Sequence, residues 1–90
     1  MMTLRTLVTK KSLAEISEAL EASDLAGELV ACEEGADLDI EVDGVSAGTF
    51  YLSPVEGGTR VEPDVALEEQ ADIEAWAEVL GVDAEDLEAF

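Results

Sequence analysis

The chain has 90 residues, of which 23 are Asp or Glu and only 4 are Lys or Arg, so its formal net charge at neutral pH is −19. This length suits one domain, and the shortage of basic residues argues against direct binding to nucleic acid phosphates. A charge this large is typical of disordered chains, but 48% of the residues are hydrophobic and recur periodically, which predicts a folded domain.

A strand and a helix are expected first. Residues 3–9 alternate weakly and contain three β-branched Thr residues, which favours a strand. Ser12 and Glu15 have the spacing of a capping box, so a helix should begin at Ser12 and end at about 22–25. One apolar stripe of this helix should face the core: Leu13, Ile16 and Leu20. Three basic residues of this region should pair with neighbouring acids or else form a local basic contact site: Arg5, Lys10 and Lys11.

Residues 28–33 predict a second strand. Its continuous apolar run over 29–32 is typical of a central strand that is covered on both faces. Cys32 is the only cysteine, so it cannot form an intramolecular disulfide, and we expect it to be a buried small hydrophobe. The pair Glu34-Gly35 indicates a turn.

The strongest local pattern is a β-hairpin over residues 36–52. Acidic and apolar residues alternate before Asp43-Gly44, the dipeptide that favours a type I′ turn. We expect one set to face the core, namely Leu38, Ile40 and Val42, and the other to face water, namely Asp37, Asp39 and Glu41. A two-residue turn would leave Phe50 and Leu52 on the wet face, so we also predict a β-bulge at Gly48 that brings both inside.

The next strand should be limited by prolines. Ser53-Pro54 is expected to end regular pairing, and Gly57-Gly58 indicates another hairpin turn. The strand that follows has four residues on one face: Thr59, Val61, Pro63 and Val65. Because Pro63 has no backbone N–H to donate, it should place this strand at an edge or end it.

From Gln70 the period becomes helical, with Asp72 as a candidate N-cap and Gly81 as the residue after the helix. Its apolar face should comprise Ile73, Trp76, Ala77 and Leu80, and Asp83 and Asp86 should open a last short turn that carries Leu87 and Phe90. The order is β-α-β-β-β-β-α within one α+β domain, residues 1–90: a mostly antiparallel twisted sheet of about five strands with two helices on one face. We expect Leu20, Ile40, Trp76 and Leu80 to share one core.

No pattern in the chain supports catalysis, a cofactor or a specific metal. Asp39-x-Glu41-x-Asp43-Gly44 is similar to the start of an EF-hand loop, but Phe50 stands where that loop needs a bidentate Glu. Gly57-Gly58 lacks the Lys-Ser/Thr of a phosphate-binding loop. With no His and with its acids predicted on wet faces, the chain offers no general base. We expect it not to be an enzyme.

The composition resembles that of small acidic proteins from salt-loving archaea, in which surface carboxylates maintain solubility in concentrated salt. This resemblance concerns composition only and implies a halophilic cytoplasm with diffuse monovalent cations at the carboxylates. The chain has no apolar run long enough for a signal sequence or a membrane span, so we expect a soluble cytoplasmic protein without membrane contact.

Three functions remain open at this point. The first is a small interaction or regulatory module that binds a protein partner or itself, as a homodimer, with Trp76, Leu80 and Phe90 as candidate anchors; otherwise Trp76 packs on the sheet. The second is a small-ligand or cation-binding domain, which a cavity lined by Tyr51 and Trp76 would favour. The third is an acidic decoy that mimics nucleic acid.

Overall fold

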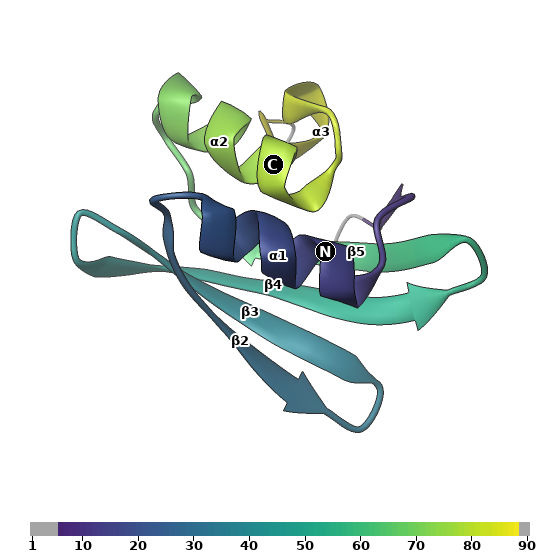
Figure 1. The fold of residues 1–90 in the computed structure, drawn as a ribbon. Helices are drawn as coiled ribbons and strands as arrows, with labels where there is room; N and C mark the ends of the chain where they lie inside the picture. Colours follow the sequence, from purple (N-terminus) through teal and green to yellow (C-terminus); the bar gives the residue numbers. More distant parts are fainter. Residues whose placement is uncertain (1–5, 89–90) are drawn as a thin grey trace, which may run out of the picture.

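The protein forms one α+β domain, seen in a computed structural model that describes residues 6–88 (Figure 1). Its elements are β1 (Leu7–Thr9), α1 (Leu13–Ala22), β2 (Ala26–Cys32), β3 (Gly35–Val42), β4 (Val45–Val55), β5 (Gly58–Val65), α2 (Gln70–Leu80) and α3 (Ala84–Glu88). The strands form an antiparallel sheet in the order β1-β5-β4-β3-β2. All three helices lie over the same face of this sheet (Figure 1). The predicted class and element order are confirmed.

The hairpin of β3 and β4 has the predicted turn and bulge. Asp43 and Gly44 have φ values of 54° and 79°, as a type I′ turn requires, and Val42 pairs with Val45 across it. Ile40 pairs with Gly48 and Glu41 with Ser46, so Ala47 is the extra residue of a bulge. Beyond the bulge the alternation is shifted by one residue. Four side chains of the hairpin are consequently buried as predicted: Leu38, Ile40, Phe50 and Leu52.

The second strand is present as predicted, but the position and burial expected for it were wrong. It lies at one edge of the sheet rather than in the centre, and the Cys32 side chain is exposed rather than buried. The helices cover one face only, and on β2 just Leu29 becomes half-buried, so a continuous apolar run did not indicate burial on both faces. The turn that follows is Glu33-Glu34, one residue earlier than predicted.

Both prolines are accommodated differently from the prediction. Pairing in β4 continues through Pro54 to Val55, which pairs with Gly58 across a turn at Glu56-Gly57. Because β3 begins at Gly35, Pro54 lies where one side of β4 has no neighbouring strand, and its missing N–H costs no ladder bond there. Likewise β5 runs past Pro63 and is flanked by β1, which pairs with residues 59–61. The predicted inward face of β5 is confirmed.

The caps of the helices agree with the sequence at three of four positions. Glu15 N–H donates to Ser12 Oγ over 3.2 Å, and Ser12 N–H donates to Glu15 Oε1 over 3.0 Å, which is the predicted capping box. The bond from Ser12 N–H is the main cause that lowers the pKa of Glu15, so its contribution to stability is present at neutral pH and is lost in acid. Gly81 ends α2 with φ 77°. Asp72, however, lies within the first turn, and Glu69 is the N-cap of α2.

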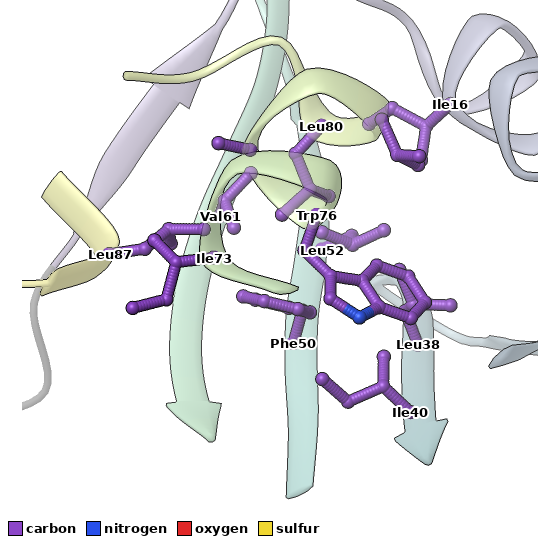
Figure 2. Close-up of a cluster of buried hydrophobic side chains, with 12 residues drawn as sticks. Ile16, Leu38, Ile40, Phe50, Leu52, Val61, Ile73, Trp76, Leu80 and Leu87 are labelled. Atoms are coloured by element: carbon purple, nitrogen blue, oxygen red, sulfur yellow. The ribbon is translucent and has the colours of Figure 1, made fainter. Parts of the chain in front are cut away.

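The core lies between the sheet and the helices, and Trp76 of α2 is its largest side chain (Figure 2). The ring centroids of Trp76 and Phe50 are 6.2 Å apart, a separation at which tilted aromatic pairs stabilise a core. Ile40 and Leu80 belong to the same buried cluster, and Leu20 packs against it. The predicted common core is therefore confirmed.

The turn between β1 and α1 ties the sheet to the end of α2. Thr59 Oγ1 donates to the Lys11 carbonyl over 2.8 Å, and Thr9 Oγ1 donates to the Gly81 carbonyl over 3.2 Å. Lys11 Nζ donates to the carbonyls of Glu78 and Val79 rather than to a carboxylate, as suits a cation at a helix C-terminus. Between residues 6 and 88 the one ion pair joins Arg60 to Glu62. The expected pairing of Lys10 and Lys11 with acids is therefore not seen. Arg5 lies outside the described residues.

Replacing Thr59 by Val should lower the free energy of unfolding by about 1–2 kcal/mol, because the partly buried Lys11 carbonyl loses its donor while the side-chain shape is kept. The matched control is Thr49→Val, which removes an exposed bond to Asp39 and should cost less than about 0.5 kcal/mol. Urea unfolding in molar KCl measures both changes. Equal losses of unfolding free energy in the two variants would show that the bond to the Lys11 carbonyl stabilises the protein no more than an exposed bond does.

Candidate interaction surface

The face of the sheet opposite the helices, here called the outer face, is not covered by any other element of the described chain (Figure 1). The strand register places alternate residues of all five strands on it. Its middle row runs from Glu62 through Tyr51 and Asp37 to Val30. The row on one side of it comprises Asp64, Thr49, Asp39 and Glu28, and the row on the other side begins with Val8, Arg60 and Ser53.

Large apolar side chains are concentrated on the outer face. Exposed large hydrophobic residues of the described chain number five, and four of them lie here: Val8 at 66% exposure, Val30 at 45%, Tyr51 at 39% and Val55 at 38%. The fifth, Val45, lies beside the turn between β3 and β4. Single exposed apolar residues are ordinary; here four share one uncovered face, with charged residues between them, such as Asp37 between Tyr51 and Val30.

Acidic side chains occupy one end of the same face. Glu28 on β2 lies directly opposite Asp39 on β3, and such like-charged cross-strand pairs are destabilising. Thr49 Oγ1 donates to Asp39 Oδ1 over 2.7 Å, which orients that carboxylate. Among the described residues no group of three or more His, Cys, Asp or Glu is arranged to hold a metal ion.

The structure places two of the three predicted anchors in the core. Trp76 and Leu80 are fully buried, so the alternative in which Trp76 packs on the sheet is the one observed; Phe90 lies outside the described residues. Tyr51 and Trp76 are on opposite faces of the sheet, so the cavity that would have favoured a ligand-binding domain does not form between them. The sequence did contain a signal for the outer face: once a bulge buries Phe50 and Leu52, Tyr51 between them must point outward.

Two of the hollows on the helix side of the sheet adjoin α1. One of about 430 Å³ lies between α1 and α2, where Lys11, Leu25 and Val79 contribute to its lining. The other, of about 480 Å³, lies between α1 and the edge strand β2 and is here called the edge groove. Its apolar lining comes from Leu20, Leu25 and Leu29.

Comparison with known proteins gives no assignment, since no protein-family model matches the chain and neither a curated protein nor a solved structure does. Within residues 6–88, no helix has the length and apolar character needed to cross a membrane. The function has to be argued from the outer face and the sheet edge.

Proposed function

We propose that this protein is a small non-enzymatic interaction module of a salt-rich cytoplasm, which binds a protein partner through the outer face of its sheet. The observation that carries this proposal is the position of Val8, Val30, Tyr51 and Val55 on a sheet face that no described element covers. Aromatic residues are enriched at protein interfaces, where a ring gives a large contact area at small entropic cost. Tyr51 is central in this surface, between Glu62 and Asp37.

The charge supports the environment that we propose. With 23 acids against 4 bases, the surface remains strongly negative, and only one ion pair forms among residues 6–88. A surface of this kind keeps a protein soluble where salt screens the repulsion between its carboxylates. In the same medium long-range electrostatic steering is weak, so close contacts, the apolar ones of Tyr51 among them, should provide most of the affinity for a partner.

Replacing Tyr51 by Asp should reduce capture of the partner about tenfold, because a desolvated charge would replace an apolar contact. The tagged chain is used to capture protein from a lysate of the source cells in concentrated KCl, and the bound material is quantified by mass spectrometry. The matched control is Val45→Asp, which adds the same charge at an exposed position beside a turn. Equal recovery with wild type and with both variants would contradict binding through the outer face.

A further inference from the structure

The edge strand β2 has little of the usual protection against pairing with another chain. It has seven residues, AGELVAC, and pairs on one side with β3, while no described residue pairs with its other side. In an antiparallel ladder every second residue turns its N–H and C=O away from its neighbour, so β2 presents unpaired backbone groups at the edge. Sheet edges are commonly protected by charged side chains, especially Lys, by Pro or by a very short strand; β2 has one charged residue, Glu28, and no Lys or Pro, whereas β1 at the opposite edge has only three residues.

The edge groove lies where side chains of an added strand would project. Gly27 and Leu29 pair with the inward-facing Ile40 and Leu38, so they mark the helix side of β2. Side chains of the core, among them Trp76 and Leu20, pack directly against Gly27, so the groove lies beside Gly27 along α1 rather than above it. A strand beside β2 would place alternate side chains in this groove, whose lining includes Ser17 and Glu21 as well as Leu20, and the remaining ones on the outer face.

The charges around β2 indicate which kind of chain could pair with it. On the outer face the added strand would lie next to Glu28, which stands beside Asp39, and Glu21 contributes to the lining of the groove. The turn that ends β2 is Glu33-Glu34. A second copy of this chain would bring another net charge of −19 against these acids, whereas Lys or Arg side chains would complement them.

We propose that β2 is a docking strand for an extended segment of a basic partner protein, which joins the sheet as a sixth strand. Its apolar side chains enter the edge groove, and its Lys or Arg side chains lie on the outer face beside Glu28. The proposal rests on the proposed function in that it specifies the chemistry of the partner, but it uses the edge of the sheet rather than Tyr51 at the centre of the outer face.

The test uses the full chain, at the lowest KCl concentration that gives a native circular dichroism spectrum, and a labelled nine-residue peptide of alternating Lys and Val. Fluorescence anisotropy should show saturable binding, and hydrogen exchange should show that amides of β2 become protected. A peptide of the same composition with its Lys and Val in two separate blocks should bind about tenfold more weakly, because it cannot place one residue type on each face.

Glu28→Lys should weaken binding of the alternating peptide about tenfold, since it reverses the charge beside the added strand and places a Lys on the edge. The matched control is Glu74→Lys, which makes the same change of charge on the exposed side of α2 and should alter the affinity less than about twofold. Equal losses from the two variants, unprotected β2 amides, or equal binding of the two peptides would each overturn the proposal. Protection of β2 without peptide that rises with protein concentration would also overturn it, by identifying a second copy as the occupant.

The outcome is separable from that of the proposed function. Tyr51→Asp should leave the affinity for the alternating peptide unchanged within about twofold, because Tyr51 lies two strands away from β2. If capture of the partner is insensitive to Tyr51→Asp while the peptide protects β2, the outer-face proposal fails and docking at the edge stands. If Tyr51→Asp abolishes capture of the partner while the peptide leaves β2 unprotected, docking at the edge fails and the outer-face proposal stands.

Discussion

Far-UV circular dichroism should show a largely unfolded chain in about 10 mM KCl and a cooperatively folded one as KCl rises to about 2 M, because salt screens repulsion between surface carboxylates. Acids on one face of a strand, such as Asp37, Asp39 and Glu41, are about 7 Å apart. Two such charges repel by about 0.6 kcal/mol in unscreened water. With a Debye length of about 8 Å this falls to about 0.25 kcal/mol, and in 1 M salt it falls below about 0.1 kcal/mol.

One pair is negligible, but the chain carries 23 acids, and the structure records a single ion pair among residues 6–88 to offset them. The summed repulsion can therefore rival the whole stability of a small domain, about 5–10 kcal/mol. A domain of this size has little in reserve, since it buries only about 60–65% of its unfolded surface. Because the summed repulsion between carboxylates is comparable to the stability of the domain, we expect the chain to unfold at low salt.

A charge variant makes the salt test specific. Glu28→Gln removes one member of the like-charged pair with Asp39 and should lower the KCl concentration at the folding midpoint. Glu74→Gln removes an exposed acid of α2 and should lower that concentration less. A native spectrum and an unchanged melting temperature from 10 mM to 2 M KCl would contradict the halophilic interpretation and leave the nucleic-acid decoy as the better explanation of the charge.

The features that could be predicted from the sequence are those that local rules determine. Asp43-Gly44 favours positive φ at both positions whatever surrounds it, and the capping box of Ser12 and Glu15 satisfies its own backbone groups. The bulge, predicted at Gly48 and observed with Ala47 as its extra residue, followed from a conflict within the hairpin, because only a shift of one residue buries both Phe50 and Leu52. In each case the deciding residues are neighbours in the sequence or across one turn.

The features that could not be predicted depend on strand order. The run that ends at Cys32 has the composition of a central strand, but which strand takes the edge is decided by packing of the helices on the whole sheet. The same holds for the candidate surface: the large side chain of Trp76 suggested an anchor, yet the helix that carries it turns it into the core. The predicted bulge implied that Tyr51 points outward, but which other residues share the outer face with it became clear only from the register across all five strands.

Ile40→Ala should lower the free energy of unfolding by about 2–5 kcal/mol, toward the upper end of that range. Ile40 is fully buried in β3, and its cross-strand neighbours are Gly27 on β2 and Gly48 on β4. Because neither neighbour has a side chain, neither can move to fill the cavity, and the lost contacts are not replaced. The measurement is urea unfolding in about 2 M KCl, since urea is uncharged and leaves the screening intact.

Two milder variants on the same strand calibrate this result. Ile40→Val removes one methylene group and should cost about 0.5–1.5 kcal/mol. Val42→Ala lies on the same face near the turn, where the side chain is only half-buried, and should cost about 1 kcal/mol. If β3 crosses the core beneath Trp76, Ile40→Ala must lower the free energy of unfolding more than either of these two variants does. A loss below about 0.5 kcal/mol for Ile40→Ala would place the core elsewhere. The same variant should also raise the KCl concentration at the folding midpoint, because a less stable domain needs more of its repulsion screened before it folds.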